Sequence, residues 1–160
     1  MYTLISNSEK ETMEFAKKLA SYLKSGDTIV LSGDLGAGKT KFTEGFLGFF
    51  NLEEEISSPT FTIVNEYHKD GINIYHFDVY RLSSSDEFYA IGGEEYLENG
   101  ISIIEWGEII EDILPEDYIK ITIEKDLNNE LSRKLIIDCK GNKFNDIINN
   151  LNKETLNWKY

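Results

Sequence analysis

The feature that most constrains this chain is a glycine-rich segment at residues 33–40. It reads GDLGAGKT and matches the phosphate-binding pattern G-x-x-x-x-G-K-[ST] at every fixed position. An apolar run at 28–31 precedes it, and aromatic and leucine residues at helical spacing follow it. A buried strand and a helix are therefore predicted on either side. This context favours a nucleotide-binding loop over the alternative, a glycine turn beside a surface lysine.

Each fixed residue type in the motif has a physical reason. Glycines let the backbone turn its N–H groups toward phosphate oxygens, and the following helix points the positive end of its dipole at the same anion. Lys39 supplies a mobile cation for the outer phosphates, and the hydroxyl of Thr40 can ligate a Mg²⁺ ion that bridges two phosphates. Nucleotide binding is therefore the leading hypothesis.

Length, charge and cysteine content restrict the other classes. The 160 residues suit one compact domain over 1–160, and a formal net charge of -13 disfavours autonomous binding to a nucleic-acid backbone. One cysteine allows no intramolecular disulfide, which fits a reducing compartment, and no segment approaches transmembrane length. These features predict a soluble, cytoplasmic protein without a membrane partner.

Apolar spacing predicts alternating helices and strands. Ser8 and Glu11 form a capping box for a helix that is expected to end at Gly26. Asp70-Gly71 predicts a hairpin between strands at 61–67 and 72–78. The remaining elements expected are a helix from Ser84 interrupted at Gly92-Gly93, a strand at 101–104, a short helix around 109–113, a peripheral hairpin over 119–123 and 131–139, and a closing helix over 144–151. This order predicts a P-loop NTPase-like α/β fold, a three-layer sandwich with a mixed central sheet and a C-terminal hairpin plus helix.

Two carboxylates are candidates for the acidic group that phosphoryl transfer needs at a strand end. Glu105 follows four mainly apolar residues, as expected of a residue that holds Mg²⁺ or its waters. Asp78 ends the strand at 72–78, beside His76 and Arg81. Each carboxylate alone is equally compatible with a solvated strand end or a turn, and only the combination with the loop favours catalysis.

Four ordered segments of the chain resemble the bacterial TsaE family. They are the loop at 33–40, Ser58-Pro59-Thr60-Phe61, the segment HFDVYRL at 76–82, and Glu105-Trp106. The resemblance extends from about Ser8 to Pro115. It implies an ATPase of the tRNA threonylcarbamoyladenosine pathway, slow alone, that assists the TsaB–TsaD complex in modifying an adenosine next to the anticodon. Contact with tRNA would then be indirect, through these partners.

The resemblance also implies roles for individual residues. Lys39 and the loop backbone would hold the ATP phosphates, and Thr40 and Glu105 would bind Mg²⁺. Thr60 would act as a switch-like residue near the terminal phosphate, with Asp78 as the second catalytic carboxylate. The implied cofactor-binding set, in which Thr12 lies near the adenine, is Thr12, Asp34, Leu35, Gly36, Ala37, Gly38, Lys39, Thr40, Lys41 and Trp106. For Trp106 a place in the core is the alternative.

Other functions share parts of this pattern. A small-molecule kinase can have the same loop and sheet, but such kinases clamp the transferred phosphoryl group with several arginines, and this chain has only Arg81 and Arg133. A GTPase is less compatible, because the nearest match to its Asn-Lys-x-Asp motif, at 142–145, ends in Asn. An adaptor that senses ATP without hydrolysing it stays open.

Overall fold

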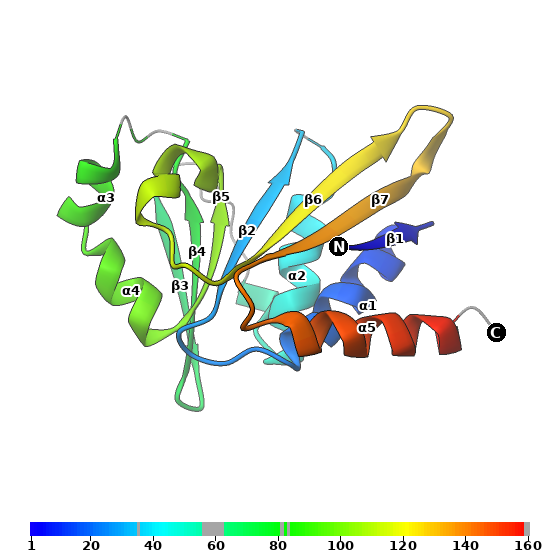
Figure 1. Ribbon diagram of the computed structural model, residues 1–160, viewed down its shortest axis with the longest axis horizontal. Helices are drawn as coiled ribbons and strands as arrows, with labels where there is room; N and C mark the ends of the chain where they lie inside the picture. Colours follow the sequence, from blue (N-terminus) through cyan, green and yellow to red (C-terminus); the bar gives the residue numbers. More distant parts are fainter. Residues whose placement is uncertain (35, 56–62, 81, 83, 159–160) are drawn as a thin grey trace.

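The computed structural model describes residues 1–34, 36–55, 63–80, 82 and 84–158. Within these residues seven strands form one mixed sheet, in the order β1-β7-β6-β2-β5-β4-β3 (Figure 1). The strands are β1 (Tyr2–Ser6), β2 (Thr28–Gly33), β3 (Val64–Lys69), β4 (Ile72–Asp78), β5 (Ile101–Glu105), β6 (Tyr118–Asp126) and β7 (Asn129–Lys140). Central β2 pairs in parallel with β5 and β6, and β4 pairs in parallel with β5, while the other pairs are antiparallel.

Helices cover the two faces of the sheet unequally. They are α1 (Glu9–Ala20), α2 (Lys39–Phe49), α3 (Ser85–Ala90), α4 (Gly93–Asn99) and α5 (Asn145–Trp158), with the 3-10 segments η1 (Glu53–Glu55) and η2 (Gly107–Ile113). Side chains of α1, α2 and α5 share the larger core cluster with one face of the sheet. A smaller cluster packs α3, α4 and η2 on the opposite face of β4 and β5, at the other end of the molecule (Figure 1). The predicted three-layer architecture is confirmed.

Local sequence signals explain how several elements begin and end. At the start of α1, the Ser8 hydroxyl accepts the Glu11 N–H at 3.1 Å, and the Glu11 carboxylate accepts the Asn7 N–H at 2.6 Å. The helix ends at Ala20, where the Ser21 hydroxyl donates to a carbonyl of the last turn, and not at Gly26 as predicted. At the tip of the β3–β4 hairpin, Asp70 and Gly71 have φ angles of 51° and 81°, as the predicted two-residue turn requires.

The structure differs from the sequence-based prediction at β1 and at the hairpin of β6 and β7. β1 was not predicted. The hairpin of β6 and β7 is present but is not peripheral, because β6 lies directly beside β2, with Ile119 opposite Ile29. The predicted short helix around 109–113 is present as the 3-10 segment η2. Of the predicted strand at 61–67, residues 64–67 belong to β3, and Phe61 and Thr62 lie outside the described residues.

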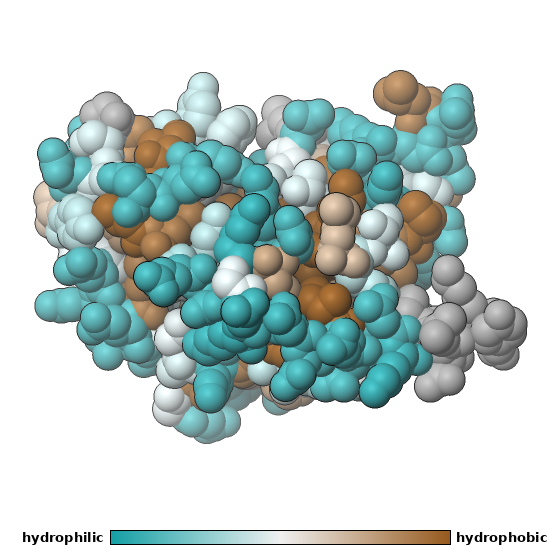
Figure 2. All heavy atoms as spheres, viewed as in Figure 1, coloured by the Kyte–Doolittle hydropathy of each residue, from teal (hydrophilic) through white to brown (hydrophobic). Residues whose placement is uncertain are grey.

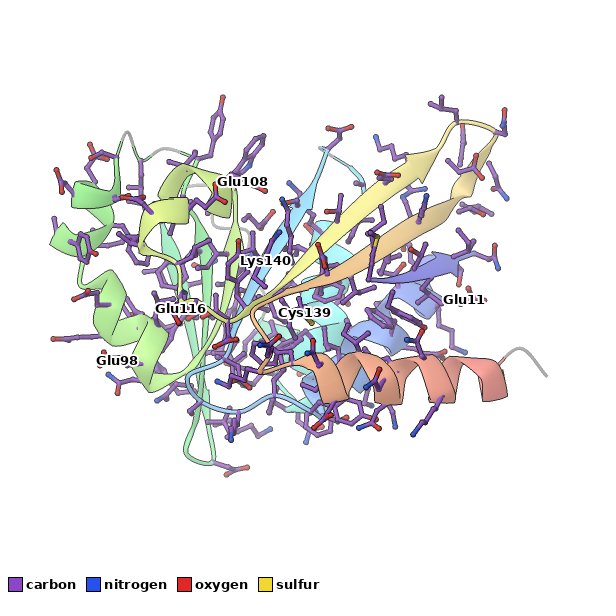
Figure 3. The ribbon with its side chains drawn as sticks, viewed as in Figure 1. Glu11, Glu98, Glu108, Glu116, Cys139 and Lys140 are labelled. Atoms are coloured by element: carbon purple, nitrogen blue, oxygen red, sulfur yellow. The ribbon has the colours of Figure 1, made fainter. Side chains whose placement is uncertain are left out.

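Cys139 lies on β7, close to the start of α5 (Figure 3). Its thiol is half-buried and donates to the Phe144 carbonyl at 3.8 Å. Burial raises the pKa of the Cys139 thiol, so it stays protonated at neutral pH. This thiol is therefore a structural group. No helix among the described residues is long and apolar enough to cross a membrane.

Candidate functional site

The loop between β2 and α2 has a backbone that glycine makes possible. Gly33, Gly36 and Gly38 have φ angles of 154°, 78° and 116°. A Cβ atom on Gly33 would lie 2.7 Å from the Ile123 carbonyl oxygen of neighbouring β6, so only glycine fits where the loop leaves the sheet. Gly38 caps α2 without a side-chain hydrogen bond, which leaves N–H groups of the first helical turn available to an anion.

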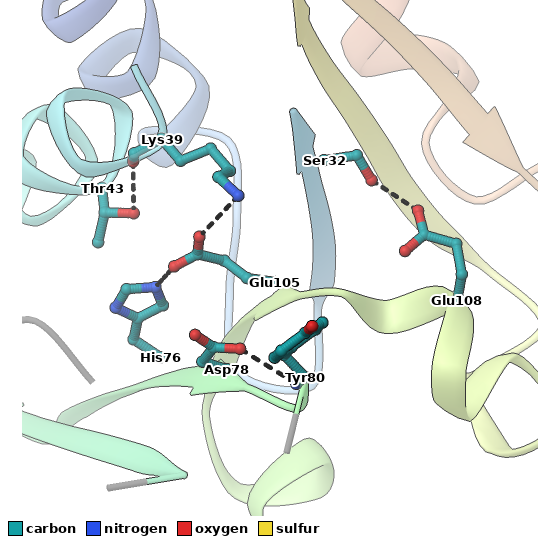
Figure 4. A network of polar contacts seen from close by, with 8 residues as sticks. All are labelled: Ser32, Lys39, Thr43, His76, Asp78, Tyr80, Glu105 and Glu108. Atoms are coloured by element: carbon teal, nitrogen blue, oxygen red, sulfur yellow. Dashed lines mark hydrogen bonds and ion pairs between the residues drawn. The ribbon is translucent and has the colours of Figure 1, made fainter. Parts of the chain in front are cut away.

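Glu105 and Asp78 stand side by side at the carboxyl ends of β5 and β4. The two strands are parallel neighbours, and Asp78 is the register partner of Glu105. Lys39, the first residue of α2, extends toward them from the loop, and its Nζ lies 3.4 Å from Glu105 Oε1 (Figure 4). The side chains of Lys39 and Glu105 are each 13% exposed. The loop cation and the strand-end carboxylate therefore share one partly enclosed site.

His76 on β4 completes the contacts of Glu105. Its Nε2–H donates to Glu105 Oε2 at 2.6 Å (Figure 4). Burial raises the pKa of the Glu105 carboxyl, but the hydrogen bond and charge of His76, together with the charge of Lys39, outweigh burial and hold the pKa below its ordinary value. Glu105 is thus an anion at neutral pH, the form that binds a cation.

Two aromatic rings stand at the edge of this site. Trp106 is 44% exposed, has a left-handed φ of 65°, and places its indole ring 5.4 Å from Lys39 Nζ. The ring of Tyr80 lies against it, with centroids 4.9 Å apart. The backbone N–H of Tyr80 donates to Asp78 Oδ1 at 3.1 Å, so this carboxylate also shapes the turn after β4. Trp106 is therefore not a core residue, which removes the alternative considered from the sequence.

A cleft of about 780 Å³ adjoins Lys39 and Trp106. It opens beside the loop, between η2 and the end of β6, and its lining includes Ser32, Glu108 and Leu127. The Ser32 hydroxyl donates to Glu108 Oε1 at 2.6 Å, a contact separate from the Lys39–Glu105 pair (Figure 4). Hydrophilic side chains cover most of the molecular face in Figure 2, and apolar side chains show between them in patches over both halves.

The structure brings some predicted site residues together and leaves others apart. Lys39, Glu105, Asp78 and Trp106 converge. Thr12 is 2% exposed and its hydroxyl hydrogen-bonds Ser6 Oγ at 2.7 Å, in the interior beside β1. Of the other predicted residues, Asp34, Gly36 and Thr40 are exposed, Ala37 is buried, and Gly38 is half-buried. Lys41 is half-exposed and pairs with Glu44 and Glu9. Leu35, Thr60 and Arg81 lie outside the described residues.

Sequence reasoning missed one residue that supports the loop. Arg133 on β7 donates from Nε to the carbonyl oxygen of Ala37 at 2.9 Å. Its Nη1 donates to the carbonyls of Glu130 and Ser132 at 2.6 and 2.8 Å. No short motif signals this role, because it depends on where β7 joins the sheet.

The fold and the site together define a P-loop NTPase-like α/β protein, with a glycine-rich loop, its lysine and an acidic strand end in one place. The family described as "Threonylcarbamoyl adenosine biosynthesis protein TsaE" matches residues 6–135. The chain belongs to the TsaE family, and so to the biosynthesis of threonylcarbamoyladenosine in tRNA.

Individual relatives agree with this assignment. The chain is 43% identical to the tRNA threonylcarbamoyladenosine biosynthesis protein TsaE of Rickettsia conorii over 143 residues, 89% of this chain and 81% of the relative. It is 37% identical to that of Bacillus subtilis, over 90% and 89% of the two chains. The crystal structure of Bacillus subtilis YdiB is similar with a TM-score of 0.75 at 31% identity, over 96% of this chain and 95% of that one.

Proposed function

We propose that the protein is a Mg²⁺-dependent ATPase of the cytoplasm that assists the TsaB–TsaD complex in threonylcarbamoyl transfer to the adenosine next to the tRNA anticodon. The observation that carries the proposal is the convergence of Lys39 with Glu105 at the mouth of a glycine loop. A polyphosphate needs a cation such as Lys39, and the metal ion that accompanies it needs a carboxylate such as Glu105.

The loop fits the phosphates of ATP. The N–H groups in the first turn of α2 and the ammonium of Lys39 provide positive potential where several negative charges would gather. Lys39 is paired with Glu105, so phosphate and this carboxylate would compete for the same cation. Trp106 stands beside Lys39 and would limit access of water to the phosphates.

The residues present also fit Mg²⁺. This ion prefers oxygen ligands and takes only one or two from the protein when it binds with phosphates. Thr40 and the ionised carboxylate of Glu105 would supply them, and the ion would neutralise charge that develops on the phosphates. Among the described residues no group of three or more acidic, histidine or cysteine side chains is placed to hold a metal ion by itself.

Asp78 and Thr60 are the proposed contributors to hydrolysis itself. Asp78 is half-buried next to Glu105, where a carboxylate can orient an attacking water. Thr60 belongs to the segment that the family resemblance links to the terminal phosphate.

The hydrogen bonds that Arg133 makes support slow hydrolysis by the isolated protein. Its guanidinium is engaged by three backbone carbonyls, so it is not available to stabilise charge on a transferred phosphoryl group. A partner that completes the site would then accelerate the reaction, and the acidity of the chain makes recruitment of tRNA through partners more favourable than direct binding.

One assay tests the proposal. Phosphate release from ATP and from GTP is measured for the protein alone, with TsaB–TsaD, and with TsaB–TsaD and tRNA, using Lys39→Ala as the background. We expect slow Mg²⁺-dependent ATP hydrolysis that the partners accelerate, and a Thr60→Ala variant that the partners no longer accelerate. Rapid hydrolysis that TsaB–TsaD does not change would contradict the partner role, and hydrolysis equal to the Lys39→Ala background under all conditions would contradict the ATPase.

A further inference from the structure

The two oxygens of the Glu105 carboxylate have different partners. Oε2 accepts the hydrogen bond from His76 at 2.6 Å, whereas Oε1 faces Lys39 at 3.4 Å. His76 comes from β4 and Lys39 from α2, so the carboxylate is held between the sheet and the loop helix (Figure 4).

His76 is a fixed group. Its side chain is 4% exposed, and its strand lies in the interior of the sheet between β3 and β5. It is opposite Ile103 in the register of β4 with β5, and its ring reaches along the strands to Glu105. Lys39, in contrast, is mobile, because its long aliphatic stem lets the ammonium group move.

The other ring nitrogen of His76 argues against a purely structural role. Nδ1 is buried and has no hydrogen-bond partner among the described residues. A buried polar atom without a partner costs stability, and an apolar side chain would avoid that cost. Within the part of the chain that the structure describes, the contact with Glu105 is the polar interaction that the imidazole gains in return.

We propose that His76 is a positioning residue, which anchors Oε2 of Glu105 so that Oε1 stays aimed at the loop when Lys39 turns to phosphate and a divalent cation takes its place. That a divalent cation and phosphate bind here is part of the proposed function, on which this inference rests. His76 is the group that keeps the Glu105 carboxylate in one orientation, both when it pairs with Lys39 and when it binds the cation.

The physical reason is pre-organisation. When Lys39 leaves, an unanchored glutamate would regain rotamer freedom and could turn either oxygen toward solvent, and the cation would have to order it again. A hydrogen bond from a buried imidazole removes that requirement. Loss of such a supporting contact typically weakens metal affinity 10- to 100-fold.

The test uses Mn²⁺ as the probe, with the full chain and a non-hydrolysable ATP analogue. Free Mn²⁺ is followed by electron paramagnetic resonance, and analogue affinity is measured separately in EDTA. For His76→Leu we expect the Mn²⁺ concentration at half-saturation to rise about 10-fold or more, while affinity for the metal-free analogue changes less than about two-fold. If His76 were merely structural, His76→Leu would lower stability without raising the Mn²⁺ concentration at half-saturation relative to the dissociation constant of the metal-free analogue.

Two further variants keep the test valid if His76→Leu does not fold. His76→Gln retains an N–H donor near the position of Nε2 and should recover most of the Mn²⁺ affinity, whereas His76→Asn is too short to reach Glu105 and should not. The matched control is His68→Leu. His68 is the other histidine of the chain and is exposed on β3, so this variant should behave as the wild type.

The outcomes separate the two proposals. Wild-type protein that binds neither analogue nor Mn²⁺ would overturn the proposed function and this inference with it. Wild-type protein that binds both, with His76→Asn or folded His76→Leu equal to it in Mn²⁺ affinity, would overturn the role of His76 alone.

Discussion

Arg133 on β7 and Ala37 in the phosphate loop are joined by a hydrogen bond of 2.9 Å, from the Nε–H of the arginine to the carbonyl oxygen of the alanine. Ala37 is fully buried, and its own N–H donates to the Asp34 carbonyl, so the loop backbone is held from two sides. A carbonyl that is held outward helps keep the neighbouring N–H groups directed inward, where an anion would bind.

Replacement of Arg133 by methionine should therefore loosen the loop. Arg133→Met keeps an unbranched side chain but leaves the Ala37 carbonyl without its donor, and we expect a several-fold loss of nucleotide affinity with about 1–2 kcal/mol of destabilisation. Fluorescent-nucleotide titration and urea unfolding measure the two effects. Lys134→Met, at the exposed neighbouring position, is the control. Unchanged affinity in a folded Arg133→Met protein would show that the loop does not need this contact.

Lys39→Ala should abolish productive ATP binding. Removal of the ammonium leaves the phosphates facing only backbone dipoles, while Glu105 loses its cation and repels them. Calorimetric titration with ATP should show a loss of at least about 100-fold, and circular dichroism should stay native. Lys10→Ala, at an exposed pair on α1, should bind as the wild type. Equal ATP affinity in Lys39→Ala would rule out the loop as the phosphate site.

Glu105→Gln should separate nucleotide binding from hydrolysis. The amide keeps the size of the side chain but is a poorer metal ligand than the anion, so nucleotide affinity should stay within a modest factor while Mg²⁺-dependent hydrolysis is lost. Asp78→Asn should also slow turnover. Glu98→Gln, at an exposed position on α4, serves as the control (Figure 3). If neither variant at the strand ends slowed hydrolysis, both carboxylate assignments would have to be abandoned.

The lowered pKa of Glu105 predicts a particular pH dependence of stability. Because the folded pKa lies below the ordinary value of 4.5, ionisation of Glu105 favours the folded state. This contribution is complete above pH 4.5 and is lost as the pH falls below it through the folded pKa. The difference in unfolding free energy between the wild type and Glu105→Gln should thus change below pH 4.5 in favour of the glutamine variant. A constant difference from pH 7 to pH 3 would contradict the lowered pKa.

Gly33→Ala should destabilise the protein by about 1–3 kcal/mol, since the new methyl group meets a strand carbonyl and the backbone is left-handed there. Gly48→Ala is a matched control on α2, where a Cβ meets nothing within 4 Å and alanine favours the helix. Thermal unfolding of both variants measures the contrast. An equal or higher melting temperature for Gly33→Ala would show that the loop can leave β2 by another path.

Features that depend on neighbouring residues were predictable from the sequence. The capping contact between Ser8 and Glu11 and the turn at Asp70-Gly71 need only a few adjacent side chains, and the structure contains both. The place of Glu105 at a strand end follows from the apolar run before it. Its proximity to Lys39 could be predicted because Lys39 follows the loop after β2, and the parallel strands β2 and β5 end at the same edge of the sheet.

Features set by long-range pairing could not be predicted in the same way. Alternation of Ile119, Ile121 and Ile123 with polar residues indicates a strand with one uncovered face, which is correct, but it does not say whether the strand is central or peripheral. The contact of His76 with Glu105 depends on the register of β4 against β5, and that of Arg133 with Ala37 on the place of β7. No local pattern specifies either.

The pairing of β1 with β7 has a consequence for synthesis of the chain. Tyr2 lies opposite Ile137, so β1 leaves the ribosome before its partner β7, by on the order of ten seconds at ordinary elongation rates. During that interval the phosphate loop already exists as a sequence but lacks Arg133 at its back. The loop at 33–40 therefore cannot reach its finished geometry until the β6–β7 hairpin has emerged and joined the sheet.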